Sequence, residues 1–255
     1  MKSPCILLII VCTLSLTGCA STKQADSDSS LGKAQQTLDS LYQHYSAKDS
    51  YLLRESYPFD EQHKVTYLAS EDQANTPNQF SYLWPYSGTF SAVNALFEAT
   101  HDKKYQKLLD KRVLPGLEEY FDIQRTPNAY SSYIQTAPTS DRFYDDNVWL
   151  GIDFTDIYQI TQEKRYLDKA QLIWKFIESG TDSLLGGGIY WCEQKKESKN
   201  TCSNAPGSVL ALNYLKQLMT ASTSDKEKNY MNGRKRIYKT PLITSILTIS
   251  VLTER

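Results

Sequence analysis

One helical pattern recurs along the chain, and this repeat limits the possible folds more than any other feature. Residues 87–99, 147–160 and 205–219 are apolar nearly all the way around a helix, as expected of a helix that is buried on every side. The polar turns that follow, "THDKKYQKLL", "TQEKRYLDKA" and the weaker "TSDKEKNYMN", align at intervals of about 60 residues. The sequence therefore predicts a series of helical hairpins.

The first two turns lead into helices with a single apolar face, at residues 105–120 and 166–177. Pro115 should kink or interrupt the first of these helices. Buried helices that alternate with one-sided helices predict two concentric rings, an α/α toroid, although an open solenoid fits the same repeat. In a toroid, the segments "SYLWPYSG", "SDRFYDDN" and "CSNAPG", each ahead of a buried helix, would converge at one end and line a pocket.

Two adjacent carboxylates, Asp145 and Asp146, stand directly ahead of the second buried helix. A helix N-cap needs only one Asp, and either residue fits that role equally well. Two neighbouring acids repel each other, which raises the pKa of one of them. A glycosidase uses this difference, because one carboxyl serves as the acid and its ionised partner as nucleophile or base. Neighbouring side chains can reach the separation of about 5–5.5 Å that retaining glycosidases use.

The first 30 residues predict export. Residues 6–16 are almost purely apolar, too short for a bilayer core of about 30 Å, and we interpret residues 1–18 as a signal peptide. The ending "LTGC" looks like a bacterial lipobox, which predicts a lipid on Cys19 and an anchor in the outer membrane, on its periplasmic or cell-surface side. Residues 19–30 are polar and should form a flexible tether.

Charge and residue spacing argue against several other classes of protein. A net charge of −1 gives no attraction to nucleic acid, and the His residues are too widely separated to form a metal cluster. Cys192 and Cys202 flank the polar segment "EQKKESKNT", between two short β-type pieces. Because export permits disulfides, we expect these two residues to pair and close a hairpin.

The segments "SDRFYDDNVWLGIDF", "GGGIYWCEQKKESKNTCSNAPG" and the stretch from "KVTYLASEDQ" to "GLEEYFD" together resemble family 76 of the glycoside hydrolases, the endo-α-1,6-mannanases, and in particular its lipoprotein members from gut Bacteroidota. The resemblance extends from about residue 31 to about residue 219. It implies an (α/α)6 toroid, retaining cleavage of α-1,6-linked mannose backbones and no cofactor. Asp145 would be the nucleophile and Asp146 the general acid/base.

The same resemblance implies that aromatic and Gly-rich loops form the substrate cleft for α-mannan. From their positions in these loops, the candidates for substrate binding are Trp84, Tyr144, Gly187, Gly188, Trp191 and Asn204.

The resemblance stops after about Ser224. We therefore assign residues 31–224 to a partial toroid and residues 225–255 to an aberrant tail. Six hairpins of about 60 residues need more than the 255 residues present, so a frameshifted or prematurely ended reading frame is expected. The alternatives to a mannanase are a mannan-binding surface lipoprotein without catalysis, an inactive remnant, or an enzyme that transfers sugar to sugar rather than to water.

Overall fold

A computed structural model describes residues 29–64 and 77–224 of the chain, with side chains up to residue 219. The predicted signal peptide, the lipid attachment site at Cys19, most of the predicted tether and the predicted tail at 225–255 lie outside these ranges. Inside them, Ser29 forms the N-cap of the first helix, because its hydroxyl accepts the N–H of Gly32 at 3.0 Å. The first described helix therefore begins at Ser30.

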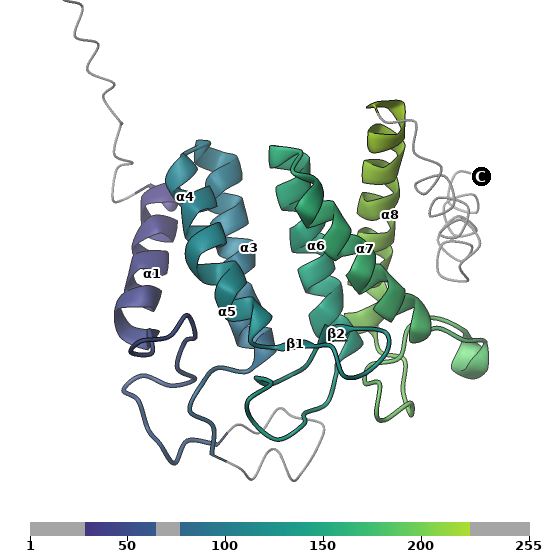
Figure 1. Ribbon diagram of the computed structural model, residues 1–255, viewed down its shortest axis with the longest axis horizontal. Helices are drawn as coiled ribbons and strands as arrows, with labels where there is room; N and C mark the ends of the chain where they lie inside the picture. Colours follow the sequence, from purple (N-terminus) through teal and green to yellow (C-terminus); the bar gives the residue numbers. More distant parts are fainter. Residues whose placement is uncertain (1–28, 65–76, 225–255) are drawn as a thin grey trace, which may run out of the picture.

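The described part of the chain is built of helical hairpins that stand side by side in an arc (Figure 1). The predicted all-α toroid class is confirmed. The inner helices are α3 (Leu83–Thr100), α6 (Tyr144–Thr161) and α8 (Thr201–Ser224). The remaining helices are α1 (Ser30–Tyr45), α4 (Lys103–Leu108), the π-helical turn η1 (Leu109–Val113), α5 (Leu114–Glu118), α7 (Lys164–Ser179) and the 3-10 turn η2 (Leu184–Gly186).

The repeated turns have the same geometry at the ends of α3 and α6. His101 and Gln162 both adopt the left-handed conformation, with φ of 54° and 59°, and each N–H donates to a helix carbonyl four residues earlier. Thr100 and Thr161 each donate a hydroxyl to a carbonyl of the last helical turn. The aligned residues of the sequence repeat therefore perform the same helix-ending role.

Pro115 does not break the first outer helix. It lies in the first turn of α5, and η1 precedes it directly. A proline inside a helix lacks an N–H and pushes against the carbonyl four residues earlier. The wider π-helical turn makes room for the proline ring. The interruption predicted at Pro115 therefore takes the form of a local change from α-helix to π-helix.

The core lies between the inner and outer helices, with α6 packed against α3, α7 and α8. Phe90 of α3 and Phe154 of α6 meet edge to face, with ring centroids 4.9 Å apart. Gly151 lets α6 approach α8 closely, because a Cβ at this position would lie 2.7 Å from Leu210. None of the helices within residues 29–64 and 77–224 has the length and apolar character needed to cross a bilayer.

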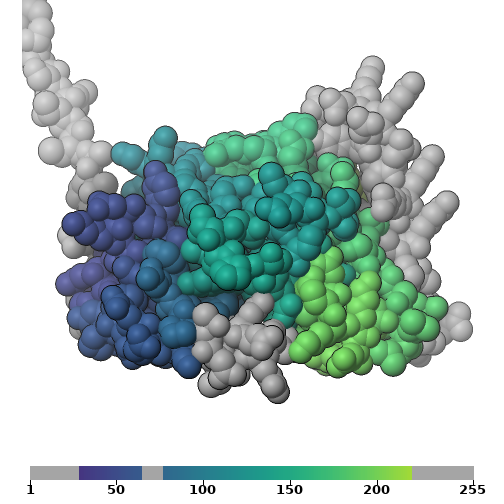
Figure 2. Space-filling view, turned by 60° about the horizontal axis from the view of Figure 1, so that its bottom comes forward, coloured from purple at the N-terminus to yellow at the C-terminus, as the bar shows by residue number. Residues whose placement is uncertain are grey.

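The long segments that join one hairpin to the next gather on one side of the molecule, at the bottom of Figure 1, whereas the short turns after α3 and α6 lie on the opposite side. Two short strands, β1 (Phe121–Asp122) and β2 (Ala129–Tyr130), pair antiparallel among the long segments. The side-chain amide of Asn147, on α6, both accepts the N–H of Tyr130 and donates to its carbonyl, each at 2.9 Å. Segments from successive hairpins therefore form one continuous surface at this end (Figure 2).

Candidate active site

Asp145 and Asp146 lie in the first turn of α6. The N-cap is Phe143, whose extended backbone (φ −98°, ψ 134°) provides no side-chain cap. Neither Asp is therefore the N-cap, the alternative that the sequence left open. Both carboxyls are free to face a pocket at the positive end of the helix dipole.

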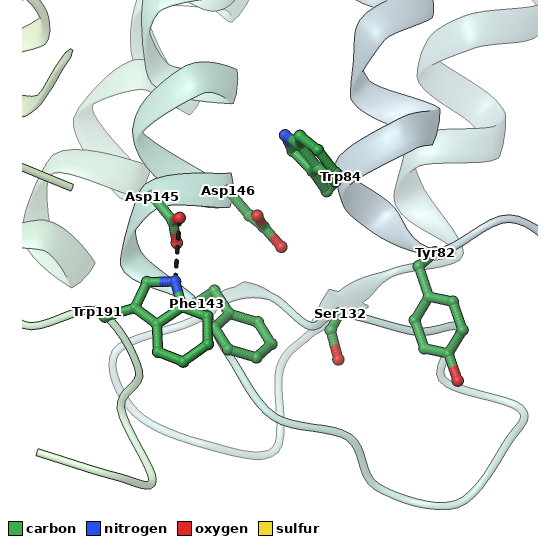
Figure 3. A pocket seen from close by; sticks show the side chains of 7 residues that line it. All are labelled: Tyr82, Trp84, Ser132, Phe143, Asp145, Asp146 and Trp191. Carbon is green, nitrogen blue, oxygen red and sulfur yellow. Dashed lines mark hydrogen bonds between the residues drawn. The ribbon is translucent and has the colours of Figure 1, made fainter. Parts of the chain in front are cut away.

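The pocket has a volume of about 180 Å³ and opens on the loop end of the molecule (Figure 3). Asp145, Asp146 and Phe143 come from the start of α6, whereas Tyr82 and Trp84 come from the start of α3. The remaining walls are Ser132 and Trp191. The volume is below the about 300–1,000 Å³ of typical small-molecule sites, so the pocket can enclose only a small part of a larger ligand.

The carboxyl of Asp145 is held by an aromatic partner. The indole N–H of Trp191 donates to its Oδ2 at 3.1 Å (Figure 3). Burial raises the pKa of Asp145 above its ordinary value. Hydrogen bonds from the thiol of Cys202, from backbone N–H groups and from Trp191 act in the opposite direction and lower it.

Asp146 is buried more deeply than Asp145, with 8% of its surface exposed. Burial raises its pKa well above the ordinary value, and the neighbouring charge of Asp145 raises it further. Both pKa values are therefore raised, but hydrogen bonds limit the rise at Asp145, whereas burial and the neighbouring charge act together at Asp146. One ionised carboxylate beside one protonated acid is the arrangement that acid–base chemistry on a glycosidic bond requires.

Backbone pairing places Trp191 beside the start of α6. Phe143 and Cys192 form an antiparallel bridge, and the N–H of Tyr144 donates to the carbonyl of Trp191 at 2.9 Å. The rings of Phe143 and Trp191 lie 5.0 Å apart. The indole is thus held by both its backbone and its ring.

Of the substrate-binding candidates, Trp84 and Trp191 line the pocket together with the Asp pair. Trp84 is 59% exposed, and its ring stands across the pocket from Trp191 (Figure 3). The prediction for Tyr144 was wrong. This side chain is 1% exposed and stacks on Phe176 of α7 at 4.5 Å, because successive helix residues point about 100° apart.

Gly187, Gly188 and Asn204 do not line this pocket either. The amide of Asn204 accepts the N–H of Ile189 at 2.7 Å and donates to its carbonyl at 2.9 Å. A Cβ on Gly188 would lie 2.3 Å from Asn204 Oδ1. Gly188 and Asn204 therefore shape the loop that precedes Trp191. The side-chain amide of Asn204 bonds to the backbone of this loop, so its role here is structural support.

The sequence missed three pocket residues, Tyr82, Ser132 and Phe143. Tyr82 and Phe143 are the N-cap residues of α3 and α6, so the point in the sequence where each helical pattern begins could have identified them. Ser132 follows β2 and reaches the pocket through a long-range contact, since its carbonyl accepts the N–H of Leu83 at 2.8 Å. No local sequence signal announces that contact.

The predicted disulfide is also wrong: Cys192 and Cys202 are both free thiols. Cys192 is buried in the bridge with Phe143. Cys202 is exposed and belongs to the first turn of α8. They do not occupy facing strands of a hairpin, which was the premise of the pairing. Among the described residues, no cluster of three His, Cys, Asp or Glu side chains could hold a metal ion.

Comparison with solved structures shows several relatives. The chain is 28% identical to a family 76 glycoside hydrolase, a mannosidase, from Bacteroides thetaiotaomicron (TM-score 0.60, covering 82% of this chain and 52% of that one). It is 26% identical to a family 76 enzyme from a bovine strain of the same species (TM-score 0.58, 83% and 42%). The chain thus spans about half the length of these proteins. No curated protein shows significant similarity to it.

A third structure is an inactive variant of the α-1,6-mannanase GH76A of Salegentibacter, in which two consecutive Asp are replaced by Asn, in complex with α-1,6-mannotriose. It is 23% identical to the chain (TM-score 0.51, covering 82% and 50%). At this identity the likeness concerns the fold. The family itself follows from the sequence, which matches Glycosyl hydrolase family 76 over residues 56–232. The chain belongs to glycosyl hydrolase family 76.

Proposed function

We propose that the chain is a retaining glycosidase that cleaves α-1,6-mannosidic linkages in mannan. The observation that carries this proposal is the unequal environment of two adjacent carboxyls in an aromatic-lined pocket. Asp146 is buried and favours its proton, whereas Asp145 accepts an indole N–H that favours its charge.

In this proposal, Asp146 gives its proton to the glycosidic oxygen as the bond to the leaving sugar breaks. Asp145 attacks the anomeric carbon and forms a covalent mannosyl ester. Asp146, now ionised, takes a proton from water, and that water releases mannose from Asp145. The first step uses a protonated Asp146 and an ionised Asp145. The second step returns both residues to these protonation states.

The aromatic walls fit a sugar ligand. A pyranose ring presents C–H groups that pack on an aromatic face, while its hydroxyls remain free for polar partners. Trp84 and Trp191 offer such faces on either side of the carboxyl pair (Figure 3). The Salegentibacter relative supports the choice of linkage, because its variant with two consecutive Asp replaced was captured with α-1,6-mannotriose.

A second candidate is mannan binding without hydrolysis. The large exposed ring of Trp84 would hold a sugar whether or not the Asp pair reacts. In either case, we propose that a lipid on Cys19 attaches the chain to the outer membrane, a proposal that rests on the sequence of residues 1–19.

The test is the release of reducing ends from debranched α-1,6-mannan by the parent chain, with Asp145→Asn and Asp146→Asn as matched controls. Activity in the parent that both substitutions abolish supports hydrolysis by the pair. Mannan binding by a folded parent that releases no reducing ends would support the second candidate instead. Product analysis with an added mannoside acceptor separates hydrolysis from transfer to sugar.

A further inference from the structure

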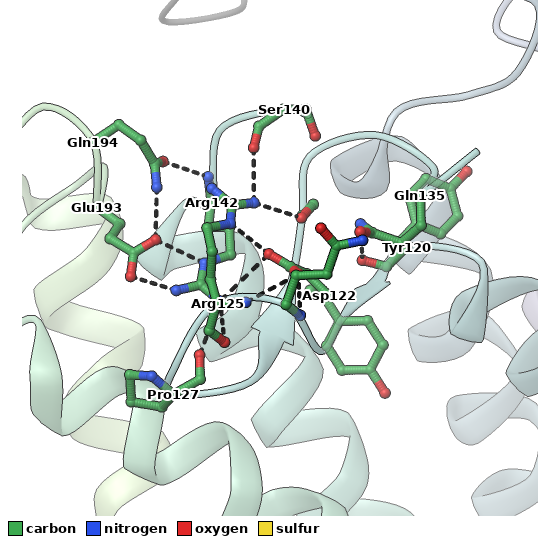
Figure 4. Close-up of polar contacts among 12 residues, drawn as sticks. Tyr120, Asp122, Arg125, Pro127, Gln135, Ser140, Arg142, Glu193 and Gln194 are labelled. Carbon is green, nitrogen blue, oxygen red and sulfur yellow. Dashed lines mark hydrogen bonds and ion pairs between the residues drawn. The ribbon is translucent and has the colours of Figure 1, made fainter. Parts of the chain in front are cut away.

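Arg142 is fully buried, with 0% of its surface exposed, although it lies three residues ahead of Asp145 and outside the pocket. Its guanidinium makes a two-point contact with the carboxylate of Glu193: Nε donates to Oε2 at 2.7 Å, and Nη2 donates to Oε1. Nη1 donates to the carbonyl of Pro127 at 2.8 Å (Figure 4). A buried cation with this many partners fixes its surroundings.

Glu193 belongs to the segment that carries Trp191. Its N–H donates to the carbonyl of Arg142 at 3.0 Å, while the N–H of Arg142 donates to Oε1 of Gln194 at 2.7 Å. These contacts fasten two short antiparallel segments (Figure 4). The backbone bond from Tyr144 to Trp191 continues the pairing. One segment leads to Asp145 and the other begins with Trp191.

We infer that the buried Arg142–Glu193 ion pair is a positioning device, which holds the indole N–H of Trp191 on the carboxylate of Asp145. The inference rests on the proposed function, since it names residues that prepare the proposed nucleophile. Arg142 and Glu193 touch no substrate. They act through Trp191, whose Nε1 lies 3.1 Å from Asp145 Oδ2.

The consequence is a change in the ionisation of Asp145. If the ion pair is weakened, Trp191 gains freedom and its hydrogen bond to the carboxylate is made less often. The pKa of Asp145 then rises, because burial favours the protonated form while the Trp191 bond opposes it. The thiol of Cys202, on α8, is the other titratable group beside this carboxyl, and the substitutions below leave it in place.

Arg142→Lys keeps the positive charge but cannot reproduce the two-point contact with Glu193. Glu193→Gln keeps the shape and removes a negative charge. A direct effect of that lost charge would lower the pKa of Asp145, whereas loss of the Trp191 contact raises it. The sign of the change in Glu193→Gln therefore separates positioning from simple electrostatics.

Asp122→Asn is the matched control. Asp122 Oδ2 lies 3.6 Å from Arg142 Nη1, so this substitution also removes a charged partner of the same guanidinium. Asp122 belongs to β1, and its side-chain hydrogen bonds go to Gln124 and Arg125 rather than to the segment that carries Trp191. A general loosening around Arg142 would affect all three variants equally.

The experiment has two readouts on the full chain. Carboxyl ¹³C titration of the Asp-labelled protein, assigned with Asp145→Asn, follows Asp145 whether or not the protein is active. The pH profile of kcat/KM on α-1,6-mannan follows the same group through its acid limb. Absence of hydrolysis in the parent would refute the proposed function, while the titration would still test the ion pair.

We expect Trp191→Phe, Arg142→Lys and Glu193→Gln each to raise the pKa of Asp145 by up to about one unit. On the acid limb of the pH profile, this shift corresponds to a loss of kcat/KM of up to about tenfold. The double variant Arg142→Lys/Trp191→Phe should match Trp191→Phe alone, because both changes remove one contact. Asp122→Asn should leave the pKa of Asp145 in place. An unchanged or lowered pKa in Arg142→Lys, or additive shifts in the double variant, would overturn the inference.

Discussion

Replacing Asp153 by Asn should remove a large part of the dependence of stability on pH. Asp153 lies on α6 with 5% of its surface exposed. The hydroxyl of Ser91, on α3, donates to its Oδ2 at 2.8 Å. Burial is the largest influence and raises its pKa to about 8, the charge of Asp156 adds to the rise, and the Ser91 bond opposes it.

The magnitude follows from the difference between the folded and unfolded pKa. Unfolding returns the carboxyl of Asp153 to an ordinary value of 3.8. Between pH 3.8 and about 8, the folded state keeps a proton that the unfolded state releases, so stability falls as the pH rises through this window. By pH 7 the loss is about 4 kcal/mol, since each pH unit corresponds to about 1.36 kcal/mol.

Urea unfolding of the parent and of Asp153→Asn at pH values from 4 to 8 measures this contribution. The free energy of unfolding of the variant, relative to the parent, should rise by several kcal/mol over that range. Ser91→Ala is a control that should act in the opposite direction. It removes the hydrogen bond that lowers the pKa of Asp153, so stability should continue to fall up to a higher pH than in the parent. Parallel curves for parent and Asp153→Asn would refute the reasoning.

Three further predictions concern the pocket and the core. Iodoacetamide should alkylate exposed Cys202 and leave buried Cys192 unlabelled in peptide mass spectra. Because burial and the charge of Asp145 raise the pKa of the Cys202 thiol, the reaction should be slow at neutral pH and faster in alkaline solution, and the adduct beside Asp145 should inactivate the chain but not Cys202→Ser. Trp84→Ala should weaken mannotriose binding by about 0.5–1.5 kcal/mol in calorimetry and leave the unfolding midpoint unchanged, because the ring is largely exposed. Gly151→Ala should lower the free energy of unfolding by about 1–3 kcal/mol, since its Cβ would overlap a neighbouring Leu side chain.

The repeat allowed the sequence to predict the helical hairpins, because both the apolar pattern and the turn that ends each inner helix recur. His101 and Gln162 show this most directly, since two different side chains occupy the same left-handed position in aligned turns. The sequence also predicted that the Asp pair stands at the start of a buried helix beside a pocket, and the structure places both residues there. The unequal protonation of the pair depends on burial and on Trp191, which sequence spacing does not reveal.

The failures share a physical cause: position along the chain does not give the direction of a side chain or the partner of a polar group. Tyr144 adjoins Asp145 in sequence but points into the core against Phe176. Asn204 lies in a predicted cleft segment, yet its amide bonds with the backbone of Ile189. The disulfide failed because the segment between the two cysteines is not a simple hairpin.

Arg142 illustrates the same limit. Its main partner, Glu193, lies 51 residues further along the chain. Only the folded structure shows that the two segments pair and that the indole of Trp191 depends on this pairing.

The most direct measurement of the roles of the two carboxyls is peptide mass spectrometry of Asp146→Asn after reaction with 2,4-dinitrophenyl α-mannoside. This substrate has a leaving group that needs no proton, so the variant should form the mannosyl ester and hydrolyse it slowly for want of a base. We expect one added mannosyl group on Asp145, and none in Asp145→Asn. Two results would contradict the account. One is an adduct on a different residue, and the other is no adduct at all together with undiminished hydrolysis by Asp145→Asn.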